Sequence, residues 1–518
     1  MNRAGQIVRQ LSMRVIVIVL TVLPTVATAN DSSQFVNAIK AEKWSVAESL
    51  FESADVRHRL PDGMTALHWA VQHENLDWTK RLLEKKADPN ASNDYSITPL
   101  LIACEKQDSS LAIALLEAGA DPDKRAAGDV SCLMHAARGG NVRTVKALVK
   151  HGAKVDADQR KGQTALMWAA DAGHADVVSV LLDAGANKDR KLSSGFNALM
   201  FACRAGSIDA AMVLIENGAK LDYAMSPDKT KDRNPRKGMT ALMLAVESAH
   251  YDLALKLVEH GADPNEQTSG YAPLHALAWV RRPQNGDDAF GDPGPRVAGK
   301  TSAMQFVRKL VKAGADVNLK LRRGSAGKGK LNPKGATPFL MASQTVDIPY
   351  MKLLLELGAD PRITNADNCS ALMAAAGIGN HHVGEHPGTV EEVAQAVRWL
   401  HSLGLDVNHV DKKRETAMHG AAYRCYPDIV NLLVSLGADP AKWDHKNKYG
   451  WTPLLIAKGN RPGSVKPDKA TIAAVTKALG NRATAASKQK APDQKWEPEN
   501  KPSAGKAKSG SKKSDKGK

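Results

Sequence analysis

The chain has 518 residues, of which 43% are hydrophobic and only 5% aromatic, and it carries a formal net charge of +16. Five cysteines in a chain of this length exclude a small disulfide-stapled scaffold. Length alone favours three or four domains, and the composition favours a core of small and aliphatic side chains.

Residues 1–29 have the features of a secretory signal peptide. Three arginines precede the apolar run 15–23, and Ala27-Thr28-Ala29 fits the small-x-small cleavage pattern. The uncharged stretch 15–30 has 16 residues, fewer than the roughly 20 that a membrane-spanning helix needs. We therefore expect an exported protein, periplasmic or extracellular, that begins near Asn30 and has no transmembrane span. An uncleaved membrane anchor is the alternative.

Residues 30–60 contain two short amphipathic stretches, Phe35–Lys43 and Val46–Phe51. They lack the motif that recurs in the rest of the chain. We interpret this segment as a degenerate N-terminal capping repeat.

From Thr65 onward one motif recurs, in forms such as TALHWA at 65, TPLLIA at 98, TALMWA at 164 and TPFLMA at 337. A second motif follows it, as in LLEAGAD at 115 and LLDAGAN at 181. Its glycines in four successive copies are Gly119, Gly152, Gly185 and Gly218, so the unit is 33 residues long. A fixed period of this length predicts a solenoid.

The residues of each unit predict a pair of helices. The Thr is a natural N-cap and the Pro that often follows suits the first helical position. The Gly of the second motif ends the second helix in a left-handed conformation. The residues after it form a hairpin-like loop into the next unit, and stacking buries apolar faces that no single unit can bury.

The two motifs closely resemble those of ankyrin repeat proteins, over roughly residues 31–480. The resemblance implies an all-α solenoid of about eleven helix pairs over 61–480. It implies a monomeric, non-enzymatic scaffold without cofactors that binds a protein partner through hairpin tips, the concave face and inserted loops. The sequence departs from the pattern at Asn197 and Ala272, which replace Thr, and at Lys86, which replaces the Gly of the second motif.

One helix position holds His68, His275 and His419 in three repeats and Met in five others. Because this is a helix-packing position that holds either His or Met, we interpret the histidines as packing residues and not as ligands. Cys104 and Cys203 share another buried position three repeats apart, too far for a disulfide. We predict free thiols at all five cysteines.

Four insertions interrupt the period, at 226–237, 283–300, 320–334 and 379–388. The third is an acid-free basic loop, and we single out Lys320, Arg322, Arg323, Lys328 and Lys330 as candidate partner-binding residues. The Lys-rich segment 481–518 has a net charge of +7 and almost no large apolar residues, so we expect it to be disordered. Together they suggest weak binding of a polyanion, such as nucleic acid, acidic envelope polymer or anionic lipid. A solvated surface is the alternative.

Two further motifs carry weak signals for chemistry. His381, His382 and His386 lie in the Gly-rich insertion, where a metal site competes with a solvated loop, and we assign no metal. Residues 294–301 match the phosphate-binding pattern G-x-x-x-x-G-K-[ST]. That loop requires a preceding β-strand, and the polar, Pro-interrupted stretch before it predicts none. We interpret the match as coincidence, and only a weak anion site at the helix start stays open.

Overall fold

The computed structural model describes residues 29–227, 237–283, 295–324, 330–380, 383–384, 386–460 and 466–490. Within these ranges the regular structure is helical, and hairpins add four isolated antiparallel bridges, such as Arg59 with Thr65. No helix in these ranges is both long and apolar enough to cross a membrane. The chain divides into two compact units, of which the second begins after Arg322.

The first unit also includes the short stretch Glu356–Gly358. Its helices are α2 (Ala29–Lys40), α3 (Trp44–Phe51), α4 (Ala66–Gln72), α5 (Leu76–Glu84), α6 (Pro99–Glu105), α7 (Ser109–Glu117), α8 (Cys132–Arg138), α9 (Val142–Lys150), α10 (Ala165–Ala172), α11 (Ala175–Asp183), α12 (Ala198–Ala205), α13 (Ile208–Glu216), α14 (Ala241–Glu247), α15 (Tyr251–Glu259), α16 (Pro273–Arg281) and α17 (Ala303–Lys312).

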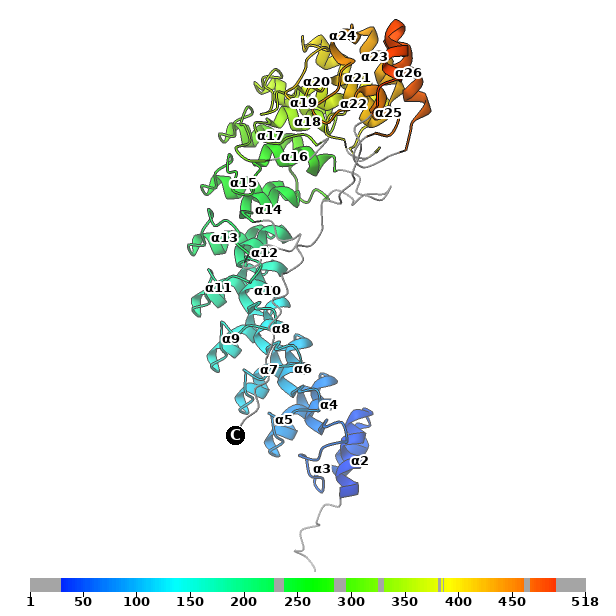
Figure 1. Ribbon diagram of the computed structural model, residues 1–518. Helices are drawn as coiled ribbons and strands as arrows, with labels where there is room; N and C mark the ends of the chain where they lie inside the picture. The colour runs from blue at the N-terminus through cyan, green and yellow to red at the C-terminus, as the bar shows by residue number, and fades with distance from the viewer. Residues whose placement is uncertain are drawn as a thin grey trace, which may run out of the picture. The chain divides into compact units, whose positions relative to one another are not determined.

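The second unit continues the same pattern of paired helices. Its helices are α18 (Pro338–Gln344), α19 (Ile348–Glu356, without its last residue), α20 (Ala371–Ala376), α21 (Val390–Ser402), α22 (Ala417–Arg424), α23 (Pro427–Ser435), α24 (Pro440–Trp443), α25 (Pro453–Ala457), α26 (Lys469–Leu479), the 3₁₀ turn η1 (Gly480–Arg482) and α27 (Ala483–Ser487). Figure 1 shows the pairs following one another in chain order within each unit.

The first helix of each pair, here called the inner helix, begins at the predicted cap. The Thr164 hydroxyl accepts a hydrogen bond from the N–H of Met167, and Gly185 after the second, outer helix has a φ of 88°. Asn197 replaces Thr as the cap of α12, and its side-chain oxygen accepts the N–H of Met200 at 3.0 Å. Ala272 has no capping side chain, and Pro273 begins α16 without one.

Small side chains let the inner helices approach one another. In α10, Ala165, Ala169 and Ala170 are buried where the helix packs between α8 and α12. The outer helices contribute larger aliphatic residues to the core, such as Leu181 of α11. All five cysteines are free thiols, and four of them are buried in this core.

The N-terminal pair α2/α3 has more aromatic packing than the repeats that follow. Phe35 and Phe51 meet each other and Trp78 of α5 at ring-centroid distances between 5.3 and 6.1 Å. Helix α2 begins at Ala29 and ends at Lys40, so it starts earlier than the amphipathic stretch indicates. The chain turns at Glu42, whose φ is 54°.

At the other end the structure corrects one boundary. The composition predicts disorder from residue 481, yet η1 and α27 extend helical structure to Ser487. The stretch ATAAS is rich in strong helix formers, and Ala486 is only 1% exposed against the last repeat. Residues 491–518 lie outside the described ranges.

Candidate functional site

The hairpins of the second unit form a row held together by backbone hydrogen bonds. The N–H of Ala366 donates to the Lys334 carbonyl at 2.8 Å, that of Lys412 to Asp367 at 2.7 Å, and that of Lys448 to Lys413 at 2.7 Å. We call these four consecutive hairpin tips, 334, 366–367, 412–413 and 448, the tip row. Each bond fixes a tip to its neighbour, so the surface is ordered without a partner.

One position supports each hairpin from inside. In three consecutive hairpins it holds Asn365, Asp411 and Asn447, and the side-chain oxygen accepts the N–H four residues later at 2.9, 2.7 and 3.0 Å. The position requires an acceptor, because the turn leaves these N–H groups without a backbone partner. Asn supplies it as a neutral group, whereas Asp411 supplies it as an acid.

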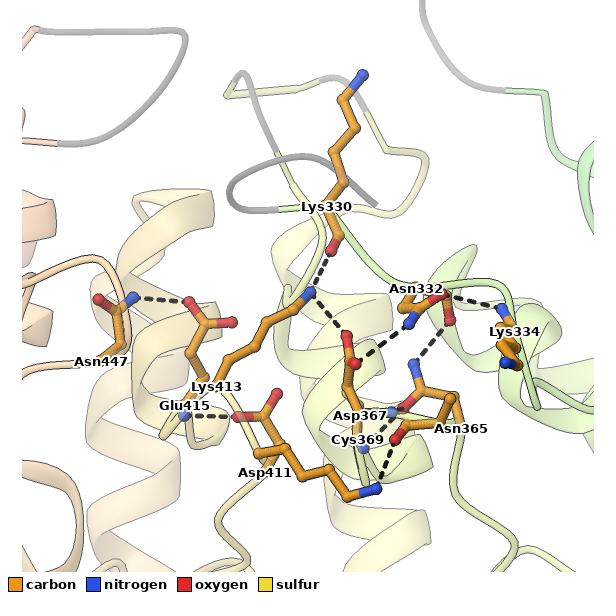
Figure 2. Close-up of polar contacts among 12 residues, drawn as sticks. Lys330, Asn332, Lys334, Asn365, Asp367, Cys369, Asp411, Lys413, Glu415 and Asn447 are labelled. Carbon is orange, nitrogen blue, oxygen red and sulfur yellow. Dashed lines mark hydrogen bonds and ion pairs between the residues drawn. The ribbon is translucent and has the colours of Figure 1, made fainter. Parts of the chain in front are cut away.

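A buried polar network connects these hairpins, as Figure 2 shows. The Lys413 ammonium lies 3.0 Å from an Asp367 oxygen and donates to the Lys330 carbonyl at 2.9 Å. Asn332 donates to the other Asp367 oxygen at 3.1 Å. Asn365 then donates to the Asn332 carbonyl at 2.8 Å. One lysine therefore ties the hairpin at 411–415 to two earlier loops.

Glu415 is the most deeply buried acid of the network, with 1% of its surface exposed. One of its oxygens accepts the hydroxyl of Tyr423 and the amide of Asn447, both at 2.8 Å. These two donors come from α22 and from the next hairpin. The carboxylate therefore links two consecutive repeats.

Burial sets the protonation of the network. Burial, together with a smaller effect of the Glu415 charge, raises the pKa of Asp411 to about 7 against the hydrogen bond from Glu415 N–H. Burial also raises the pKa of Glu415, more than the bonds from Tyr423 and Asn447 lower it. For Asp367 burial acts in the same direction, but the bonds from Lys413 and Asn332 outweigh it and the pKa is lowered. The pKa of Lys413 is correspondingly raised by Asp367, against the effect of burial.

The cations at or beside the tips are exposed, whereas two acids of the network, Asp411 and Glu415, are buried. Four exposed residues are the lysines and the arginine at or beside the tips, Lys334, Lys412, Arg414 and Lys448. Lys412 also donates to the Ala366 carbonyl at 2.8 Å. Lys334 belongs to the basic loop 320–334 that the sequence indicates, whereas Lys412, Arg414 and Lys448 are not predicted from the sequence. The repeat register could have found them, because Lys412 and Lys448 each directly follow the position of Asp411 and Asn447.

The five predicted partner-binding residues fall into separate places. Lys320 and Arg322 belong to the first unit, where Gln267 receives the Arg322 N–H at 2.9 Å and donates to the Lys320 carbonyl at 3.2 Å. Arg323 and Lys330 belong to the second unit and are exposed, and Lys330 accepts from Lys413 through its carbonyl. Lys328 lies outside the described residues.

The histidine-rich insertion gives no metal geometry in its described part. His386 is buried, and its Nε2 lies 3.0 Å from the Gly379 carbonyl and 3.2 Å from the Gln344 amide nitrogen. His381 and His382 lie outside the described residues. Among the residues that the structure describes, no group of three His, Cys, Asp or Glu side chains could hold a metal ion.

The apparent phosphate-binding motif already holds an internal carboxylate. Asp252 of α15 accepts the N–H of Lys300 at 2.7 Å through one oxygen and the hydroxyl of Thr301 through the other. A Cβ at Gly299 would lie 2.2 Å from the same carboxylate. Because Asp252 occupies the place of an anion, these groups serve to join α15 to the start of α17.

The recurring histidine position has structural partners. His68 Nδ1 lies 2.8 Å from the Thr65 hydroxyl, and Nε2 lies 3.0 Å from the Ile97 carbonyl in the next hairpin. Burial lowers the pKa of His68. The ring therefore connects the cap of its own helix to the next repeat as a neutral group.

Comparison with protein families agrees with this architecture. The family described as "Ankyrin repeats (3 copies)" matches residues 35–126, 125–192, 185–268 and 390–466, together more than half of the chain. Over 75 residues the chain is 37% identical to the glycerophosphocholine phosphodiesterase gde1 of Schizosaccharomyces pombe. That match covers 14% of this chain and only 6% of the relative. The crystal structure of the human ASB11 ankyrin repeat domain matches over all of its own length and 51% of this chain, with 22% identity and a TM-score of 0.39.

Proposed function

Since the chain belongs to the ankyrin repeat family, we propose that it is a non-enzymatic scaffold that binds a protein partner, and that it acts outside the cytoplasm. The tip row carries this proposal. Its tips are joined to one another by backbone hydrogen bonds of 2.7–2.8 Å. A surface that is already ordered loses little conformational entropy when a partner binds.

The charge distribution indicates the surface charge of the expected partner. Glu415 and Asp411 are buried, at 1% and 6% exposure, and Asp367 is paired with Lys413. The exposed charges that remain at the tips are cationic, among them Lys412 and Lys448. Opposite charge speeds encounter and favours correct orientation, so an acidic protein surface is the expected partner.

Export rests on residues 1–29 of the sequence, which lie largely outside the described residues. A fusion of these residues to a reporter that is active only after export tests this part alone. Replacing Ala27 and Ala29 by large residues should block cleavage and leave the longer form.

The second candidate is binding of a polyanion through the basic loops and the Lys-rich C-terminal segment. The acid-free basic loop and the net charge of +7 in residues 481–518 favour it. Such binding depends on released counterions, so it weakens steeply as salt concentration rises.

One capture experiment separates the two candidates. The chain from residue 30 to 518 is immobilised beside the double variant Lys412→Glu/Lys448→Glu and beside a form ending at Lys490. Arg160→Glu is the matched control, because Arg160 holds the equivalent tip position in the first unit and its N–H donates to Gly128. Each bait is exposed to native envelope extract and washed at low and at high salt.

A protein partner should stay on the wild-type chain, on the control and on the form ending at Lys490, even at high salt. The double variant should lose it by at least about tenfold, since each reversed charge at an interface costs on the order of 1 kcal/mol or more. If the captured material leaves with salt or with residues 491–518, the polyanion candidate replaces the scaffold. Retention on every bait would show that the partner uses another surface.

A further inference from the structure

A cavity of about 500 Å³ lies in the first unit, and residues of the loops at 56–59 and 86–91 supply most of its lining. Part of its lining is apolar, here called the apolar floor, and includes Val56, Leu83, Ala87, Pro89 and Ala91. A volume of this order accommodates a small organic molecule.

Three cations line the cavity: Arg57, Arg59 and Lys86. Arg57 donates through Nε to the Lys86 carbonyl at 2.9 Å, and Arg59 donates to the Ser92 carbonyl. Within the described residues, none of the three forms an ion pair with an acid.

One acid shares the cavity lining with these cations. Asp88 lines it as well, and its carboxylate accepts the N–H of Asn90 at 2.9 Å. The lining therefore carries two net positive charges beside an apolar floor.

Lys86 stands where the following repeats have glycine. Gly119, Gly152 and Gly185 take φ values of 87–90° at this position, and Lys86 takes 66°. The left-handed region is strained for a side chain with a Cβ and free for glycine. The chain therefore keeps a strained residue here, and that residue adds a third cation to the lining that contains Arg57 and Arg59.

We propose that this cavity binds a phosphate monoester whose ester group is apolar. Two guanidinium groups and an ammonium match the oxygens and the charge of a dianion. The apolar floor would take the organic part, which inorganic phosphate lacks. The phosphate could be carried by a soluble ester or by a lipid headgroup, and the experiment distinguishes these sources.

Titration calorimetry with residues 30–518 uses phenyl phosphate and inorganic phosphate as probes. Phenyl phosphate should bind saturably and at least about tenfold more tightly than inorganic phosphate, because only it reaches the apolar floor. Arg59→Gln and Lys86→Met should each weaken it by about tenfold or more. Lys124→Met, an exposed lysine in the next hairpin, is the control and should leave binding unchanged. Sedimentation with vesicles that contain phosphatidic acid then shows whether the site also accepts lipid-borne phosphate.

Lys86→Gly separates binding from stability. It restores the glycine of the other repeats, so it should raise the thermal unfolding midpoint of the free protein while it weakens phenyl phosphate binding. Lys86→Met keeps the strained backbone and should weaken binding without raising the midpoint. Equal affinity of the wild type and all three variants, or no saturable binding of phenyl phosphate, would overturn the proposal.

Discussion

Two glycines of one repeat differ in what surrounds them. A Cβ at Gly140 would lie 2.6 Å from ring atoms of His174, whereas a Cβ at Gly152 would meet nothing within 4 Å. Both have a positive φ, 73° and 87°. Moving the His174 ring would break a contact, because its Nε2 lies 3.0 Å from the Arg138 carbonyl at the end of the preceding inner helix.

We therefore expect Gly140→Ala to destabilise the protein more than Gly152→Ala. The second substitution costs the left-handed strain alone, about 1 kcal/mol. The first adds displacement of His174, for a total of about 2–3 kcal/mol. Urea unfolding followed by circular dichroism measures both. Equal midpoints for the two variants would show that the histidine ring moves aside without cost.

For single residues, the sequence predicts the role of a side chain better than it predicts which residues that side chain contacts. The occurrence of either His or Met at one position predicts a packing role for His68. Only the structure shows its contact with the Ile97 carbonyl, which lies 29 residues away. The match to a phosphate loop could not be resolved from the sequence in the same way, because Asp252 is 48 residues from Lys300. Periodicity does not tell which acid faces a loop of irregular length.

A hairpin of the second unit carries an acid where its neighbours carry amides. Asp411 lies between Asn365 and Asn447 in the repeat, and its pKa is raised from 3.8 to about 7. Above pH 4 the unfolded chain has released this proton while the folded chain still holds it. The proton on the folded state therefore stabilises it at low pH, and that stability is lost as pH rises toward 7.

The substitution Asp411→Asn should remove most of this pH dependence. The amide keeps the acceptor for the Glu415 N–H and carries no charge at any pH, so the variant should gain stability above pH 7. The upper limit is about 4 kcal/mol, from the size of the pKa change. Some slope should remain, because the pKa of Glu415 is also raised and has the same sign.

Urea midpoints of wild type and variant between pH 4 and pH 8 measure the difference. Asn365→Asp, which places an acid at the equivalent position of the preceding hairpin, is the reciprocal control. It should introduce a new loss of stability with rising pH. Parallel pH profiles for the wild type and Asp411→Asn would contradict the assigned role of Asp411.

The element boundaries follow from capping chemistry, which is local, and so the sequence predicts them well where the cap is present. Thr164 begins α10 and Gly185 follows the end of α11 in a left-handed conformation, both as expected. The sequence does less well on the tips, because the charged row forms only when hairpins from different repeats meet. Lys412 and Lys334 are 78 residues apart in sequence yet flank the same tip.

Each unit as a whole depends on its ends. In solenoids the terminal repeat must cover the last apolar face, and here α27 does so with Ala486, beyond the predicted boundary. That boundary was wrong because the sequence of residues 481–490 is polar apart from a few alanines. The alanines stabilise this end because they favour a helix and pack closely against α26, although each buries only a small apolar area.

Truncation should reveal this cap. A form ending at Gly480 should unfold at a lower temperature than a form ending at Lys490, by an amount that corresponds to about 1–2 kcal/mol for the lost helix and its contacts. Removing residues 491–518 alone should leave the midpoint unchanged. Differential scanning calorimetry of the three forms tests this, and equal midpoints for the endings at 480 and 490 would show that α27 does not cap the repeats.

The buried free thiols can report the local opening of single repeats. Cys104, Cys132 and Cys203 lie in the first unit and Cys369 in the second. A thiol-specific reagent can modify each only when the surrounding repeat opens, so labelling rates resolved by mass spectrometry would record local opening site by site. Because no bond between these thiols must form, the same chain can reach its folded state with or without an oxidant, and the labelling pattern can be compared directly across compartments.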